Sequence, residues 1–213
     1  MSKLHTIFPE DGVRAAMPEA TFTSFGLKNL SSIATLKPQT MFELGVTTWH
    51  AAIMSRQFSV APNILGDHVD WREPHLLKHV SRALNRKVLF DLSYRLANVP
   101  GTATIQPKTQ VLVAHVFPNR IHIGDVQLLD PRKPKGGVAG DDDQSHESLR
   151  LLGPTIENAV KAARDIGADQ ITLTAANRGL VSVFGRHGFA VEESPFAKQA
   201  MAMGVGIPMQ IDL

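Results

Sequence analysis

The sequence predicts an α/β (α+β) fold, in which helices flank a sheet. Apolar residues recur every three or four positions in four segments, which is typical of helices with one buried face, and alternating or β-branched runs separate them. Along the chain, the predicted elements follow the order β-α-α-β-β-β-α-β-α-β-β. The 213 residues, 43% of them hydrophobic, suffice for one domain with a packed core.

The first third of the chain is expected to supply a strand and two helices. Residues 1–30 show no sustained period, so we expect an N-terminal extension ahead of a domain at residues 31–213. A short β-like run at Ser32–Lys37 predicts the first strand of the domain. The helices are predicted from Thr40 to about Arg56 and from Glu73-Pro74 onward.

The middle of the chain predicts strands and then a loop. The strands, of which the last two form a hairpin, are Val88–Leu96, Val111–Val116 and Arg120–Leu129. Residues 132–147 are rich in Lys, Gly and Asp, which predicts a mobile loop.

A helix beginning at Gly153 is the centre of the prediction. Gly153 can serve as N-cap, and Pro154 suits the first helical position. Gly167 is expected to end this helix, and Gln170–Thr174 alternates like a strand. Because the first amides of a helix lack partners and Arg150 lies just upstream, this terminus can hold a phosphate or pyrophosphate. One helix and two strands complete the chain: Leu180–His187, Phe189–Glu192 and Ile207–Ile211.

Two motifs around this helix resemble a known family. Arg150-x-x-Gly153-x-Thr155 resembles the Gln/Arg-x-x-Gly-x-Gly/Ala pyrophosphate loop of the GNAT acyltransferase superfamily. Asn177 and Phe184, followed by Gly188-Phe189, stand where that family carries Asn, Tyr and Gly-Phe. The resemblance covers most of the chain and implies a GNAT-like fold with a mixed, mostly antiparallel central sheet.

The resemblance also implies an activity. It is that of an N-acyltransferase, most simply an acetyltransferase, with acetyl-CoA or another acyl-CoA as co-substrate and a small-molecule or peptide amine as acceptor. The amine would attack the thioester directly, since the chain has no cysteine to form an acyl-enzyme. The family builds its acceptor site from the first two helices and their loop, here about Trp49–Trp71. The implied cofactor-binding residues are Val126, Leu128, Leu129, Arg150, Gly153, Thr155, Asn177 and Phe184.

His122 and Asp125 are the predicted catalytic residues. An alkylammonium, with a pKa near 10.4, must lose a proton before it attacks, and the family often places the base on this strand. In a regular strand these two side chains point to opposite faces, so that only one could reach the cleft. His115 on the neighbouring strand is a third candidate.

Two alternatives remain open at this point. Phe184 replaces the Tyr that serves as the acid in the family, and a phenyl ring cannot donate a proton. The thiolate could leave with help from water, Ser182 or His187. Otherwise the protein is a slow member of the family or a non-catalytic binding module. The second alternative is a synthase that takes acyl chains from an acyl carrier protein. Its basis is three basic residues that suit an acidic partner, Arg132, Lys133 and Lys135.

Composition and spacing exclude other classes. The 22 basic residues nearly balance the 20 acidic ones, which predicts no nucleic-acid partner. His75 and His79 lack the Glu of a zinc-binding helix, and Asp141–Asp143 lacks a calcium-loop pattern, so we expect no metal. With no membrane-spanning run or secretory signal, a cytoplasmic location is expected. A homodimer is left open.

Overall fold

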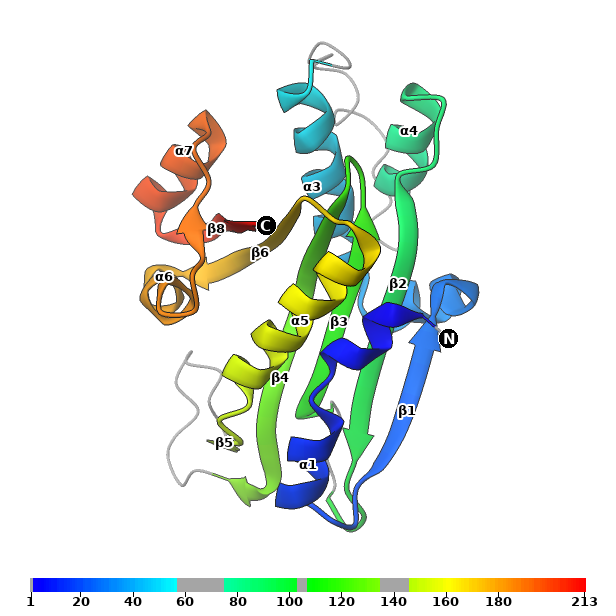
Figure 1. The fold of residues 1–213 in the computed structure, drawn as a ribbon, viewed down its shortest axis with the longest axis vertical. Helices are drawn as coiled ribbons and strands as arrows, with labels where there is room; N and C mark the ends of the chain where they lie inside the picture. The colour runs from blue at the N-terminus through cyan, green and yellow to red at the C-terminus, as the bar shows by residue number, and fades with distance from the viewer. Residues whose placement is uncertain (1, 57–74, 103–106, 135–145) are drawn as a thin grey trace.

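The computed structural model describes residues 2–56, 75–102, 107–134 and 146–213. Within these residues, eight strands form one mixed sheet in the order β1-β2-β3-β4-β6-β8-β7, with β5 attached to β4 (Figure 1). The β4–β6 pair is parallel, and the other described pairs are antiparallel. The predicted mixed, mostly antiparallel sheet flanked by helices is therefore confirmed.

The described strands and helices have the following bounds. The strands are β1 (Thr21–Gly26), β2 (Leu89–Asn98), β3 (Thr109–Val116), β4 (Arg120–Pro134), β5 (His146–Ser148), β6 (Gln170–Asn177), β7 (Ala190–Val191) and β8 (Val205–Asp212). The α-helices are α1 (Glu10–Ala16), α2 (Leu30–Leu36), α3 (Pro38–Met54), α4 (His75–Ala83), α5 (Leu152–Ile166), α6 (Arg178–Gly185) and α7 (Pro195–Met203). Two 3-10 turns, η1 (Lys3–Ile7) and η2 (Leu27–Asn29), lie near the N-terminus.

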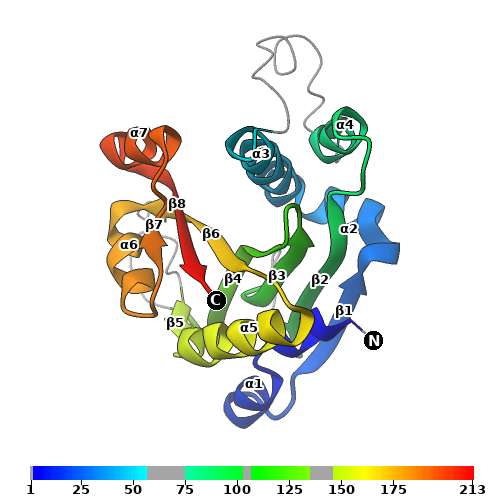
Figure 2. The same ribbon diagram turned by 45° about the horizontal axis from the view of Figure 1, so that its top comes forward.

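The sheet separates two apolar cores, one on each face. Helices α2, α3 and α4 cover one face, and η1, α1 and α5 cover the other (Figure 2). Along β3 the side chains alternate between the cores, with Leu112 and Ala114 facing α3 and Val111 and Val113 facing α5. The face on which a β4 side chain lies therefore decides which layer of helices it meets.

The N-terminal residues belong to this packing. Leu4, Ile7 and Val13 are fully buried in the α5-side core, and β1 pairs with β2. The predicted strand at Ser32–Lys37 is wrong, because Leu30–Leu36 forms α2. Leu30, Ile33 and Ala34 bury one helical face at spacings of three and four, and this outweighs the β-like composition of the run.

Further boundaries differ from the predictions. The helix expected to begin at Gly153 begins at Leu152, with Leu151 as N-cap, although it ends at the predicted Gly167, which is left-handed. Helices α1 and α7 were not predicted, and the described ends of the predicted loop at 132–147 are strand residues of β4 and β5. Residues 135–145, with Asp141–Asp143, lie outside the described residues.

A β-bulge at Gly124 bends β4 at the centre of the sheet. Ile123 pairs with Val113, whereas Asp125 pairs with Leu112, so Gly124 is the extra residue. A Cβ atom at Gly124 would lie 2.5 Å from Thr40 Cγ2 on α3, which is closer than any ordinary contact. Glycine at this position therefore allows α3 to pack directly over the bulge.

We expect Gly124→Ala to destabilise the fold by about 1–3 kcal/mol, because the added methyl group overpacks the contact with Thr40. Thr40→Ser removes the clashing Cγ2, so the Ala substitution should cost less in that background. Urea unfolding of both single variants and the double variant gives the coupling free energy. Additive effects would mean that the bulge and α3 do not meet as described.

Candidate active site

Strands β4 and β6 part at the bulge. Their parallel ladder runs over four residue pairs and ends at Ile123 and Leu173. Beyond this point β6 continues beside β8, and β4 continues beside β3 and then β5. We call the space that begins at Gly124 and Thr174 the β4–β6 opening. In the described residues no β4–β6 ladder uses the backbone amides and carbonyls along its edges, so those without another partner can pair with a ligand.

The bulge also places both predicted catalytic residues on one face. His122 pairs with Ala114 and Asp125 with Leu112, and these partners are two residues apart on β3. His122 and Asp125 therefore both face α3. The expectation that they point to opposite faces was wrong, because it assumed a regular strand, and the extra residue Gly124 shifts the alternation by one.

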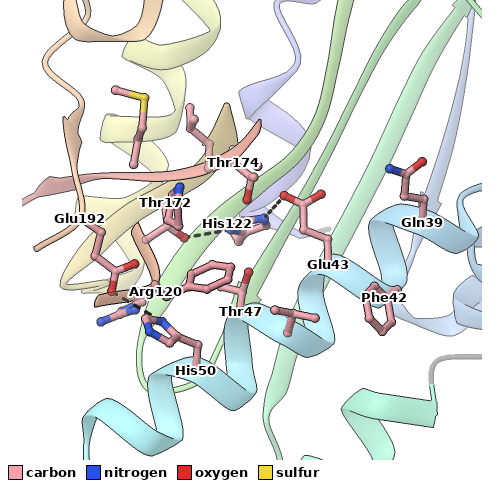
Figure 3. A pocket seen from close by; sticks show the side chains of 16 residues that line it. Gln39, Phe42, Glu43, Thr47, His50, Arg120, His122, Thr172, Thr174 and Glu192 are labelled. Atoms are coloured by element: carbon pink, nitrogen blue, oxygen red, sulfur yellow. Dashed lines mark hydrogen bonds and ion pairs between the residues drawn. The ribbon is translucent and has the colours of Figure 1, made fainter. Parts of the chain in front are cut away.

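A cavity of about 270 Å³ lies on this face, between α3 and the sheet. Its walls come from α3, β4, β6, α7 and β8, and we call it the α3 cavity. The apolar part of the wall includes Phe42, Val46, Leu173, Phe196 and Met209. The charged or titratable side chains that line it are Glu43, His50, Arg120, His122 and Glu192 (Figure 3).

His122 is held between two neighbours in the α3 cavity. Its Nδ1 lies 3.0 Å from Thr172 Oγ1 on β6, and its Nε2 lies 3.5 Å from Glu43 Oε1 on α3. The second distance suits an ion pair but lacks hydrogen-bond geometry, since Nε2 has no hydrogen-bond partner. Only 1% of the His122 side chain is exposed, against 27% for Glu43. Figure 3 shows Glu43 reaching from α3 toward the imidazole.

A second polar group lies at the far end of the α3 cavity. His50 Nδ1 is 3.6 Å from Glu192 Oε1. Burial lowers the pKa of the nearby Arg120 guanidinium, and the negative charges of Glu192, Asp212 and Asp169 offset part of this effect. The cavity thus has carboxylates at both ends and one guanidinium.

Asp125 is engaged in a cluster outside the lining of the α3 cavity. Its Oδ2 accepts hydrogen bonds from Lys37 Nζ at 2.7 Å and from Gln110 Nε2 at 3.0 Å. The buried Tyr94 hydroxyl in turn donates to Gln110 Oε1 at 2.6 Å. Since a lysine already neutralises Asp125, His122 is the better placed of the two predicted catalytic residues.

The third candidate, His115, makes contacts that stabilise the β3–β4 hairpin. Its Nε2 lies 2.9 Å from Asn119 Oδ1, and its ring packs against Phe90 with 4.9 Å between centroids. It is absent from the lining of the α3 cavity in the described part of the chain.

The N-terminus of α5 is free of side-chain caps in the described residues. Arg150 has a φ of 58°, in the left-handed region, and its amide donates to Ser148 Oγ. A Cβ at Gly153 would have the His187 ring as its nearest neighbour, at 3.5 Å, so the backbone there is open to a close approach. Thr155, in contrast, is buried, and its hydroxyl donates to the Leu151 carbonyl.

The residues predicted along β4 differ in what their backbones can offer. The amide of Leu129 donates to Lys108 O, which turns the backbone of Leu129 toward β3. By the alternation of an antiparallel pair, the amides of Val126 and Leu128 point the other way, toward the β4–β6 opening. The Leu128 carbonyl accepts from the Leu149 amide at 2.8 Å. Val126 and the Leu128 amide are therefore better suited to pair with a ligand than Leu129.

The downstream motif residues have structural contacts of their own. The Asn177 side chain caps α6 by accepting from the Leu180 amide, and Phe184 packs against Phe189 with 5.9 Å between ring centroids. Ser182 donates to Gly179 O inside α6. The role predicted for Asn177 and Phe184 beside a cofactor stays a prediction.

Glu43, Thr172, His50 and Glu192 were not identified from the sequence. For α3 a signal existed: Gln39, Glu43, Thr47 and His50 recur at spacings of four, four and three, a polar stripe beside the apolar one. Within the described ranges, no group of three or more His, Asp or Glu is placed to hold a metal ion, and no helix is long and apolar enough to cross a bilayer. Of the predicted acceptor region, residues 57–71 lie outside the described residues.

Tyr94 gives a direct test of the cluster around Asp125. Burial, and secondarily the charge of Asp125, raises the pKa of Tyr94 to about 12. Since the unfolded value is near 10, the neutral phenol should stabilise the fold below pH 10, and this contribution should be lost as the pH rises to 12. Because the chain has a single tyrosine, ultraviolet absorbance of tyrosinate reports it alone. We expect a midpoint near 12 that moves down in Asp125→Asn; a midpoint near 10 in the folded protein would contradict this environment.

No protein-family model and no curated protein sequence matches the chain. Among solved structures, it matches the PaiA N-acetyltransferase of Thermoplasma acidophilum in complex with coenzyme A, at 12% identity over 90% of this chain and 99% of that one, with a TM-score of 0.36. A Bacillus subtilis acetyltransferase in complex with CoA matches at 13% identity over 64% and 83%, with a TM-score of 0.37. A candidate streptothricin acetyltransferase of Bacillus anthracis, in complex with acetyl coenzyme A, matches at 14% identity with a TM-score of 0.36. That match covers 57% of this chain and 63% of the length of the Bacillus anthracis protein. These are the kind of enzyme whose family the sequence resembles, but identities and TM-scores this low establish no activity for the chain.

Proposed function

We propose that this protein is an acyl-CoA-dependent N-acyltransferase, most simply an acetyltransferase that moves an acetyl group from acetyl-CoA to an amine. One observation carries the proposal. The β4–β6 opening lies beside His122 of the α3 cavity, and the helix that follows β4 in the fold, α5, has an uncapped N-terminus. This combination offers a place for an anion, a slot for an extended chain and a chamber with titratable groups.

The residues present fit the diphosphate and the pantetheine arm of coenzyme A. The amides of Leu152 and Gly153 would hold the diphosphate with the guanidinium of Arg150, since Pro154 has no N–H to offer. The amides of Val126 and Leu128 would pair with the amide groups of the arm. Acyl-CoA supplies the activated thioester. The protein would hold the thioester at the bulge and accept the proton that the acceptor amine loses.

The α3 cavity is the proposed acceptor site. Its apolar wall suits the body of a small amine, and the carboxylates of Glu43 and Glu192 suit an ammonium group. The Glu43–His122 pair would take up the proton that the amine must lose before its nitrogen attacks the thioester carbon. The amine would attack directly, since there is no cysteine to carry the acyl group.

The acyl-carrier-protein alternative has less support from the described residues. The Arg132 guanidinium is bound to Asp130 and Glu19, and Lys133 lies 3.4 Å from Glu147. These two cations are therefore already paired, and Lys135, the third basic residue of this prediction, lies outside the described residues.

A non-catalytic module that binds acyl-CoA would differ from the enzyme only in turnover, so a measurement of product formation separates the two.

Binding of acetyl-CoA tests the site at α5. Gly153→Glu adds a negative charge where the diphosphate would lie, and we expect at least a 10-fold weaker affinity by calorimetric titration. The same charge at a helix N-terminus stabilises the helix, so lost binding would not reflect unfolding. Gly153→Ala is the matched control, because its methyl group meets only an ordinary contact. If the unaltered protein binds no acetyl-CoA, or if Gly153→Glu binds it equally well, this site is wrong.

Turnover tests the activity. Release of the free thiol of coenzyme A should rise when a panel of small primary amines is added one by one, and mass spectrometry should find the matching N-acetyl product. Tight binding of acetyl-CoA with no product from any amine would favour the binding module instead.

A further inference from the structure

We infer that Glu43 is the catalytic residue that takes the proton from the acceptor amine, and that His122 is a positioning residue that holds the Glu43 carboxylate. This inference rests on the proposed function and assigns the roles within it. It concerns two side chains from different elements, α3 and β4, that meet in the α3 cavity.

Burial argues against direct contact between His122 and an amine. A general base must come within hydrogen-bond reach of the proton that it removes, about 2.6–3.2 Å between heavy atoms. His122 Nε2 is a buried atom with almost no accessible surface, and Nδ1 is occupied by Thr172 Oγ1 at 3.0 Å. An amine in the cavity therefore meets Glu43 first, whose side chain is 27% exposed.

The neighbours of His122 fix which nitrogen carries hydrogen. The nitrogen that faces the Glu43 carboxylate is Nε2, and a lone pair in that position would repel the carboxylate oxygens. Nε2 therefore carries the hydrogen, and in the neutral ring Nδ1 accepts from the Thr172 hydroxyl. In this arrangement His122 has no free lone pair for a proton, whereas Glu43 has an acceptor oxygen facing the cavity.

Position along α3 separates Glu43 from the other carboxylate–imidazole pair. Thr40 lies against Gly124, where the β4–β6 opening begins, and Glu43 is less than one turn further along the helix. His50, with Glu192, is seven residues beyond Glu43, which is about 10 Å along a helix axis. Of the two pairs, the Glu43–His122 pair is therefore the one beside the arriving thioester.

The apolar wall favours proton transfer to a carboxylate. Transfer from an ammonium to Glu43 converts two charged groups into two neutral ones, and burial disfavours charged forms. The amine lone pair then forms the C–N bond, the C–S bond breaks, and its electron pair leaves with sulfur. The second amine proton passes through water to the thiolate, and Glu43 releases its proton to solvent, so that one proton is released per amide formed. Arg120, His50 and Glu192 are the other charged or titratable groups that face this chamber.

Glu43→Gln keeps the size of the side chain and removes the base. We expect kcat to fall at least 100-fold, with affinity for acetyl-CoA unchanged within about 2-fold, since general-base catalysis typically contributes factors of 10²–10⁴. Glu43→Asp retains a carboxylate and should recover part of kcat.

His122 is tested by two substitutions of similar size. His122→Gln can place an N–H where Nε2 lies and should keep more of kcat than His122→Met, which offers no donor. Both should bind acetyl-CoA as the unaltered protein does, which serves as the measure of folding, so that the difference between the two variants appears in kcat alone.

The outcomes separate this inference from the proposed function. If the unaltered protein acetylates no amine, the proposed function fails first. If it is active and Glu43→Gln retains its kcat, or if His122→Gln loses more of kcat than Glu43→Gln does, then Glu43 is not the base and this assignment is wrong.

Discussion

The β-bulge at Gly124 is the constraint on which the rest of the site depends. A sheet holds its strands together through continuous ladders, and a ligand can enter only where a ladder stops without leaving buried polar groups unsatisfied. Here β4 keeps its bonds to β3 through the bulge, while its pairing with β6 ends one residue before it. The strand can therefore turn away from one neighbour while it stays attached to the other. The fold loses few backbone hydrogen bonds, and the sheet has an opening at its centre.

The same bulge sorts the polar groups behind the sheet into two sets. Asp125 lies with Lys37, Gln110 and Tyr94, where its charge is neutralised and its hydrogen bonds are used. His122 lies with Thr172 and Glu43 at the wall of the α3 cavity. A buried polar group that is fully paired stiffens its surroundings, whereas one exposed to a cavity can exchange protons. We interpret the first set as support for α3. In the second set Glu43 is the group that exchanges a proton, and His122 and Thr172 hold it in position.

Much of the fold could be predicted from the sequence, because the strongest elements have clear periods. Helices α3 and α5 and the strands from β2 to β4 follow from apolar spacing, and the end of α5 follows from Gly167. Strand β1 and helix α2 could not be predicted in this way. Their identity is decided by what they pack against: Ile33 fills the α3-side core, and β1 borders β2. Local composition does not contain that information.

The site could be predicted only in part, for a related reason. His122 was a predicted catalytic residue, but its partners Glu43 and Thr172 come from elements far apart in the chain. The faces of His122 and Asp125 were assigned from a regular strand, and a single inserted residue reverses such an assignment. A glycine in a strand is a signal for a bulge, and Gly124 carried that signal.

A crystal structure of the protein with acetyl-CoA would test the central claim most directly. The account predicts the diphosphate at Leu152 and Gly153, the pantetheine arm beside Val126 in the β4–β6 opening, and the thioester carbon facing the α3 cavity near Glu43. Acetyl-CoA bound on another surface, with the β4–β6 opening filled by side chains, would contradict it.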